Sequence, residues 1–197
     1  MGQRICFYKI NSPFTLKEWI CEEFNVFRNW YLDIYVSGEN RDEYILCKYL
    51  TKIINFKKEF NELSNELLNE IMAEFIGVYC DLTQTKKIEL MEPFMNKRRY
   101  DKSTKLILNT SDKELICLWK IIINGRSIKD GKCFKSFTND YKVGYLSSNE
   151  CKKLEEKIKQ YFGNINADTL TEENEGIVYA LQAINEMQGK DMVIGIE

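Results

Sequence analysis

The sequence predicts a single α+β domain, residues 1–197, in which several helices cover a mixed sheet that contains both chain ends. Residues 3–10 alternate as a strand does, and a second apolar run, residues 191–197, closes the chain. Between these runs, apolar residues recur at intervals of three and four with clear helix start and stop signals. We therefore expect the terminal strand to lie beside the N-terminal one.

The N-terminal strand carries apolar side chains on both sides, with Ile5 and Phe7 opposite Cys6 and Tyr8. This pattern is typical of an interior strand. Pro13 then falls in the first turn of a helix whose apolar face begins at Leu16. An aromatic-rich stretch follows, and residues 31–36 are predicted to form another strand that ends at Ser37-Gly38.

Residues 41–82 have a helical pattern with a break near Asn55, and we interpret this range as a helical insertion. In its second part, apolar residues at spacings of three and four define one face and Glu and Lys residues the other: Phe60, Leu63, Leu67, Ile71, Phe75 and Val78. Such a helix lies on a core or on a partner.

Residues 86–105 are rich in basic side chains, among them Lys97, Arg98 and Arg99. This segment is predicted to be a loop, followed by a short strand at residues 105–109. It could be a solvated loop, or it could reach for a phosphate or an acidic partner. No glycine-rich phosphate cradle accompanies it, so we do not expect nucleic acid as a partner.

The last part of the chain contains three segments with the spacing of a capping box, at residues 111–114, 147–150 and 169–172. The first precedes a strongly apolar helix that ends at Asn124-Gly125, a common stop signal. The second precedes a helix that ends at Gly163, and the third precedes the last helix. Residues 125–143 are predicted to form a loop region.

Three stretches together resemble the YfbM-type family of small bacterial proteins of unknown function. These are Met-Gly before an aromatic strand and a helix, Gly144-Tyr-Leu-Ser-x-x-Glu150, and a terminal helix ending in Gly189-Lys-Asp-Met-Val-Ile-Gly-Ile. Residues 115–125, with Trp119, match the family's Trp-containing helix. The likeness covers about 20 N-terminal and 85 C-terminal residues, and its motifs are caps and turns. The chain lacks the family's His, and Ser148 replaces a Pro. The resemblance implies an α+β domain without a known activity.

The composition excludes several classes of function. The chain contains no His, which removes Ser-His-Asp and Cys-His catalysis and the usual zinc sites. A net charge of -2 provides no overall field for nucleic acid or an anionic membrane, and no apolar run approaches a membrane span. Seven widely spaced cysteines without a secretory signal indicate free thiols in the cytoplasm. We expect no metal, cofactor or membrane partner.

The preferred hypothesis is a protein-interaction module, for example an immunity protein that neutralises a bacterial toxin. Residues 148–197 hold ten acidic residues against five lysines, a balance that would steer a basic partner such as a basic toxin. Tyr, Trp and Arg are common at interfaces. The interface candidates are Trp30, Tyr31, Tyr35, Lys97, Arg98, Arg99 and Tyr100.

Two alternatives remain open. A histidine-free enzyme could use Cys133, which follows Lys132 in the Gly131-Lys-Cys-Phe loop, or a carboxylate pair formed by Asp130 and Asp140. A reactive cysteine needs a lowered pKa and partial exposure. A small-ligand-binding regulatory domain is the other alternative, for which the sequence offers neither a motif nor an objection. The sequence identifies no catalytic residue.

Overall fold

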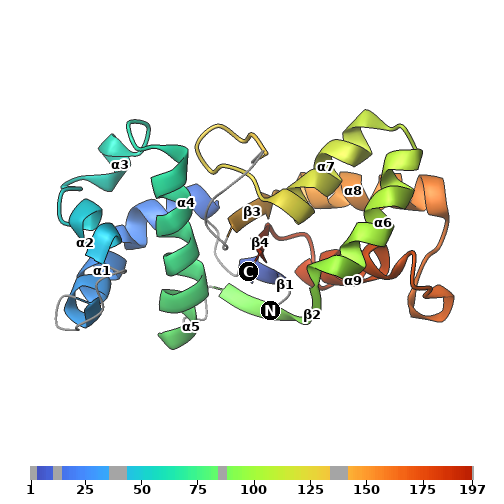
Figure 1. Cartoon of the computed structure of the whole chain (residues 1–197), viewed down its shortest axis with the longest axis horizontal. Coiled ribbons are helices and arrows are strands. Elements are labelled where there is room, and N and C mark those ends of the chain that lie inside the picture. The colour runs from blue at the N-terminus through green and yellow to red at the C-terminus, as the bar shows by residue number, and fades with distance from the viewer. Residues whose placement is uncertain (1–3, 11–14, 36–43, 84–87, 134–141, 197) are drawn as a thin grey trace.

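The computed structural model describes residues 4–10, 15–35, 44–83, 88–133 and 142–196. Within these ranges the chain forms a sheet and two groups of helices (Figure 1). The strands are β1 (Arg4–Ile10), β2 (Ile88–Asn96), β3 (Lys142–Leu146) and β4 (Met192–Ile196). The helical elements are α1 (Leu16–Tyr35), α2 (Tyr44–Leu50), α3 (Phe56–Glu59), α4 (Asn65–Glu74), the π-helical turn η1 (Phe75–Tyr79), α5 (Cys80–Leu82), α6 (Lys97–Asn109), α7 (Lys113–Asn124), α8 (Ser148–Phe162), the 3₁₀ turn η2 (Ala167–Thr169) and α9 (Glu175–Met187).

The strand order is β2-β1-β4-β3, so the α+β class and the place of both terminal strands in the sheet are confirmed. β1 is an interior strand, as its apolar residues on both sides predicted. All pairings among the described strands are antiparallel, which corrects the expectation of a mixed sheet. Between β3 and β4 the chain forms two successive helices, α8 and α9. The second returns the chain to the end where β3 stops, so β4 runs opposite to β3.

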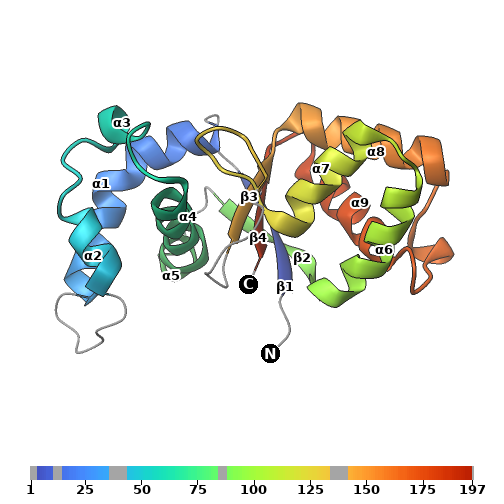
Figure 2. The same cartoon turned by 45° about the horizontal axis from the view of Figure 1, so that its top comes forward.

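The sheet lies between two helical layers (Figure 2). Helices α1–α5 cover one face, and helices α6–α9 cover the other. Side chains alternate along β1 accordingly: Ile5 and Phe7 enter the core beneath α6–α9, whereas Ile10 enters the core beneath α1–α5. Val193 of β4 points to the α1 side and Ile194 to the α6 side. No helix in the described parts of the chain has the length and hydropathy needed to cross a bilayer.

The strand predicted at residues 31–36 is wrong, because α1 continues through Tyr35. Its aromatic residues follow a helical interval rather than an alternating one. Phe27, Tyr31 and Tyr35 are four residues apart, and their rings are 5.7 and 4.3 Å apart from one to the next. Val36 lies outside the described residues.

The predicted loop at residues 86–105 and the predicted strand at 105–109 are also wrong in their described parts. β2 pairs with β1 over residues 88–96, and α6 follows without a gap. The buried residues of α6, Tyr100, Ser103 and Ile107, repeat at three and four. This helical period was concealed by the many charged residues that occupy the other positions of α6.

One of the three predicted capping boxes is confirmed, at Ser147–Glu150. At α7 the cap is Asp112, which accepts a hydrogen bond from the Leu115 N–H, while Ser111 has a positive φ of 56°. α9 begins at Glu175 after Asn174, whereas the sequence predicted a start at about Thr171. Within the expected insertion at 41–82, α2 ends at Leu50, and the predicted break falls at residues 51–55, where Asn55 caps α3. A second interruption at residues 60–64 separates α3 from α4, so the predicted apolar face from Phe60 to Val78 is not on one helix.

Candidate protein-binding surface

The residues predicted to form an interface lie in two places, on opposite sides of the sheet. Trp30, Tyr31 and Tyr35 belong to α1, whereas the basic candidates and Tyr100 belong to the first turn of α6 (Figure 2). The structure therefore does not bring the two groups together into one surface. Each group has to be considered separately.

The basic side chains of α6 face acidic side chains from the segment that leads into α9. Arg99 pairs with Glu175 at 2.5 Å, and Lys102 pairs with Glu172. These four side chains, together with Asn96 and Arg98, line an open basin of about 480 Å³. Two of the charges that made 86–105 basic and two of those that made 148–197 acidic therefore neutralise each other within the molecule.

Tyr100 belongs to the core rather than to a surface. Its side chain has no exposed area and packs between Phe7 and Trp119, with ring centroids 6.4 and 6.0 Å away. Burial raises the pKa of Tyr100 far above its ordinary value. Tyr31 is buried in the same way on the other side of the sheet, with 2% of its surface exposed. Neither side chain can contact a partner directly.

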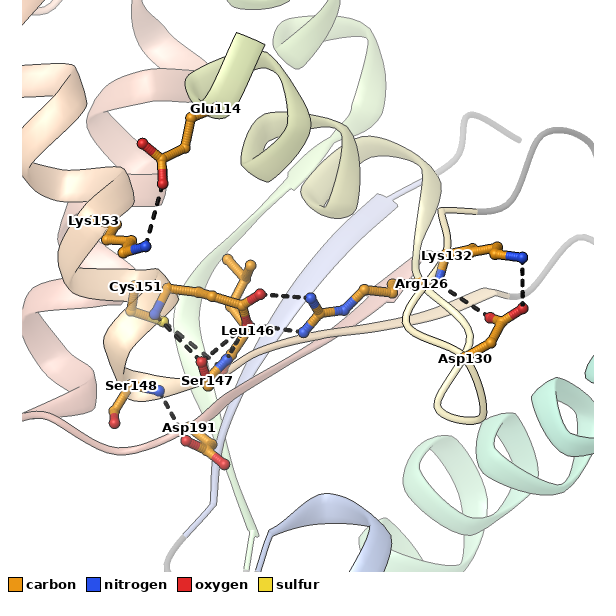
Figure 3. A network of polar contacts seen from close by, with 11 residues as sticks. Glu114, Arg126, Asp130, Lys132, Leu146, Ser147, Ser148, Cys151, Lys153 and Asp191 are labelled. Carbon is orange, nitrogen blue, oxygen red and sulfur yellow. Dashed lines mark hydrogen bonds and ion pairs between the residues drawn. The ribbon is translucent and has the colours of Figure 1, made fainter. Parts of the chain in front are cut away.

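A polar network at the β3 edge was missed from the sequence (Figure 3). Arg126 reaches toward the first turn of α8 and donates two hydrogen bonds to Glu150, of 2.6 and 2.9 Å. Its guanidinium lies 4.0 Å from the centroid of the Tyr145 ring, and only 9% of the side chain is exposed. Burial alone would raise the pKa of Glu150, but the bonds from Arg126 and Ser147 outweigh it, and the pKa lies below its ordinary value.

Arg126 and Asn69 of α4 close the outer edge of β3. The Arg126 N–H donates to the Val143 carbonyl at 3.1 Å, and the Val143 N–H donates to Asn69 Oδ1 at 3.0 Å. These bonds satisfy backbone groups that an edge strand would otherwise expose. The cavity beside Arg126 measures about 10 Å³, room for about one water molecule. The network therefore acts as a structural clamp at the edge of the sheet.

The residues proposed for catalysis have the wrong environment for it. Cys133 is half-buried, and burial raises the pKa of its thiol, whereas a nucleophilic cysteine needs a lowered pKa. A hydrogen bond from the Lys132 N–H lowers the pKa of Asp130 and holds that carboxylate within its own turn. Asp140 lies outside the described residues. At Cys133 and Asp130, the two of these positions that the structure describes, no catalytic group is assembled.

A surface on α1 combines apolar and acidic side chains, and we call it the α1 strip: Glu22, Glu23, Val26, Trp30, Asp33 and Ile34. Glu23 and Trp30 are half-buried, and the other four are exposed. Positions 22, 26, 30 and 34 follow one another at intervals of four, so they lie along one face of the helix. Val26 is 56% exposed and Ile34 is 43% exposed. Among the described residues, ten large apolar side chains are exposed; six of them belong to the α1–α5 layer, and Val26 and Ile34 share the strip.

Trp30 is held in place within the strip. Its ring contacts Tyr79 of η1 edge to face, with centroids 5.2 Å apart, and contacts Tyr31 at 6.4 Å. Burial raises the pKa of Tyr79, and the negative charge of Glu23 raises it further. Glu23 therefore lies close to this aromatic group. Trp30 was among the candidates named from the sequence, but the strip was missed because the helix was predicted to end before Tyr31.

The charged members of the strip, Glu22, Glu23 and Asp33, are all acidic. Arg28 is the one basic residue between Glu18 and Tyr35, and its guanidinium donates to the Ile53 carbonyl at 2.7 Å, toward the α2–α3 connection. The strip is thus an apolar line with carboxylates on its margins.

The chain matches no protein-family model, no curated protein and no solved structure.

Proposed function

We propose that the protein is an interaction module that binds another protein through the α1 strip. The observation that carries this proposal is the line of exposed Val26 and Ile34, with half-buried Trp30 between them, along one face of a long helix. A soluble helix usually places such residues against its own core, and exposed apolar residues grouped on one face are typical of binding surfaces.

The environment of Trp30 supports the proposal. Tryptophan is among the residues that contribute most to binding energy when a partner covers them. Its contacts with Tyr79 and Tyr31 already restrict its rotamers, so binding loses less side-chain entropy than it would for a free side chain. Trp30 would therefore act as a rigid anchor, and Val26 and Ile34 would extend the contact on both sides.

An immunity protein that neutralises a basic bacterial toxin is the form of this function that we favour. The carboxylates of the strip would accelerate encounter with a basic partner. Free thiols at Cys6, Cys47, Cys80 and Cys151, all buried, fit the reducing conditions of the cytoplasm, where such a protein acts. The immunity hypothesis is tested with a bacterial growth assay. If a toxin-like gene lies immediately upstream, co-expression of the wild-type chain with that toxin should restore growth, and co-expression of a strip variant should not.

The interaction itself is tested with two aspartate variants at exposed apolar positions in the same layer. Val26→Asp places a charge within the strip, and Ile54→Asp does so at a side chain that is 84% exposed and outside it. A partner captured from the native host with the wild-type chain is purified and measured by calorimetry. We expect V26D to weaken binding at least tenfold and I54D to leave it within about twofold.

Circular dichroism of both variants shows whether each remains folded. If a purified partner bound V26D as tightly as the wild type, the strip would not be the binding surface. If no partner formed a complex with the wild-type chain, the interaction function itself would be wrong.

A further inference from the structure

We infer that the protein binds an anionic phospholipid surface through a second exposed area, the α2–α3 patch: Ile45, Tyr49, Lys52, Ile54 and Lys58. The patch lies at the outer end of the α1–α5 layer, far from the sheet (Figure 1 and Figure 2). It shares no residue with the α1 strip, so this activity goes beyond the proposed interaction function.

The outer face of α2 carries apolar side chains. The buried residues of α2 and of the turn after it recur at helical intervals and fill the inner face: Leu46, Cys47, Leu50 and Ile53. The opposite face carries Ile45 and Tyr49, four positions apart, which are 60% and 46% exposed. A surface helix usually has charged or polar residues on this side. Two large apolar side chains are therefore available to a partner there.

Ile54 protrudes from the connection between α2 and α3. Its side chain is 84% exposed, more than any other exposed large apolar side chain in the described ranges. The backbone around it is held by the Arg28 guanidinium, which donates to the Ile53 carbonyl at 2.7 Å. The Ile54 N–H donates to Glu59 Oε1 at 3.1 Å, and the next N–H along the chain does so at 2.7 Å. A fixed backbone thus presents an apolar side chain that would gain free energy by leaving water.

The charge around these apolar side chains is basic. Lys52 and Lys58 are exposed, and neither has an ion pair within the part of the chain that the structure describes. Residues 44–62 hold four lysines against two carboxylates, and one of these, Glu59, accepts the backbone N–H groups of the connection. An anionic surface is therefore attracted to this end of the molecule, although the whole chain has a net charge of -2.

The residue types favour a lipid surface over other anionic partners. Residues 44–62 contain Lys but no Arg, whereas protein interfaces are enriched in Arg and depleted in Lys. Each lysine near an anionic leaflet strengthens binding about fivefold and needs no fixed geometry. Tyr49 suits the headgroup level, where aromatic side chains with a polar tip are enriched. A nucleic-acid backbone would attract the lysines but would give Ile45 and Ile54 no apolar surroundings.

The expectation of no membrane partner came from the net charge and from the lack of a membrane span. Neither property describes a patch that lies on the surface. Reversible attachment to a bilayer needs a few apolar side chains that enter the headgroup region and local positive charge around them. The fold provides both at the α2–α3 connection.

The test is flotation of the full chain with vesicles of two compositions, phosphatidylcholine alone and phosphatidylcholine with about 30% phosphatidylglycerol. We expect the chain to float with the anionic vesicles and to remain in solution with the neutral ones. Raising the salt concentration from about 50 to about 500 mM should weaken binding to the anionic vesicles at least fivefold, because salt screens exposed charges.

Two pairs of lysines test the contribution of charge. Lys52→Gln with Lys58→Gln should weaken binding to the anionic vesicles about tenfold or more. Lys105→Gln with Lys120→Gln is the matched control, because both lysines are exposed and belong to the α6–α9 layer, and it should leave binding unchanged.

Two serine variants test the contribution of the apolar side chain. Ile54→Ser should weaken binding to the anionic vesicles about threefold or more, since it removes apolar surface without adding charge. Leu108→Ser, at a side chain of α6 that is 47% exposed, should leave it unchanged. Circular dichroism checks that every variant is folded.

The inference would be overturned if the wild-type chain stayed in solution with both kinds of vesicle or floated equally with both. Unchanged binding by the lysine pair K52Q/K58Q or by I54S would also overturn it. Binding of polyglutamate or duplex DNA in place of vesicles would identify another anionic partner and exclude the lipid. Calorimetry of the α1 strip with a purified protein contains no lipid, so I54D remains a valid control there and the two proposals can fail separately.

Discussion

Arg126 joins three parts of the chain at the edge of the sheet. Its side chain binds Glu150 at the start of α8, its guanidinium covers Tyr145 of β3, and its backbone N–H binds Val143. Bringing such a charge pair out of water is unfavourable, so an intact buried pair adds little net stability. Removing one partner is different, because the other charge then remains desolvated without compensation.

We therefore predict that Arg126→Met lowers the free energy of unfolding by about 3 kcal/mol, the lower end of the range for broken buried pairs, since 28% of the Glu150 side chain is exposed. Urea denaturation at neutral pH measures this change. Arg98→Met is the matched control, because Arg98 is exposed, and it should change the free energy by less than about 0.5 kcal/mol.

The effect of R126M should depend on pH. Since the pKa of Glu150 is lowered in the folded chain, the stability that the pair provides is fully present above the ordinary pKa of 4.5. It is lost as the pH falls through the lower, folded-state pKa. The difference between wild type and R126M should therefore shrink in acid. A difference that stayed constant from pH 7 to pH 3 would show that lost packing, rather than the ion pair, destabilises the variant.

Among the elements, α6 and α9 make an unusually close contact at Gly176. A Cβ added there would lie 2.9 Å from Tyr100 Cδ1 and 3.1 Å from the Tyr100 Cα. Tyr100 cannot move aside easily, because it is fully buried against Phe7 and Trp119. The glycine thus sets the distance at which α9 packs on α6.

Gly176→Ala should lower the free energy of unfolding by about 1–3 kcal/mol through overpacking. The better helix propensity of Ala would offset part of this loss. Asn185→Ala, at an exposed position on the same helix, is the control and should leave stability unchanged or slightly increased. Thermal unfolding followed by circular dichroism compares the three chains. A G176A variant at least as stable as the wild type would show that the two helices separate without loss.

How well each element could be predicted from the sequence depended on whether its signal is local. The terminal strands and the Ser147–Glu150 cap were predicted because each depends on a few adjacent residues. The end of α1 and the α6 helix were missed because aromatic or charged residues concealed the helical period. The pairing of Arg99 with Glu175 joins residues 76 positions apart, and Arg126 with Glu150 joins residues 24 apart. No local pattern indicates such pairs, since the fold alone brings them together.

At the scale of the whole molecule, the sheet belongs to both cores. β1 sends Ile5 and Phe7 to one helical layer and Ile10 to the other, and β4 sends Ile194 and Val193 to opposite sides in the same way. Neither layer can lose its packing without exposing apolar side chains of strands that the other layer needs. The two layers should therefore unfold as one cooperative unit, although they are separated by the sheet.

The three tryptophans test this prediction, because they divide between the layers. Trp19 and Trp30 belong to α1, and Trp119 belongs to α7. In the Trp119→Phe variant, tryptophan fluorescence comes from the α1–α5 layer alone. In the Trp19→Phe/Trp30→Phe double variant, tryptophan fluorescence comes from the α6–α9 layer alone. In each variant the urea midpoint from fluorescence should equal the midpoint from circular dichroism, which reports all helices. Comparing the two probes within one variant removes the effect of the substitution itself on stability.

A change in one layer should also be detected from the other. Phe75 is fully buried on the α1 side, so Phe75→Leu, which removes buried atoms, should lower the midpoint reported by Trp119 across the sheet. If the Trp119 midpoint stayed in place while the circular dichroism curve separated into two steps, the layers would be independent units. Coincident shifts would mean that the clamp at Arg126 and the α1 strip depend on one folding equilibrium, because β1 and β4 supply side chains to both cores.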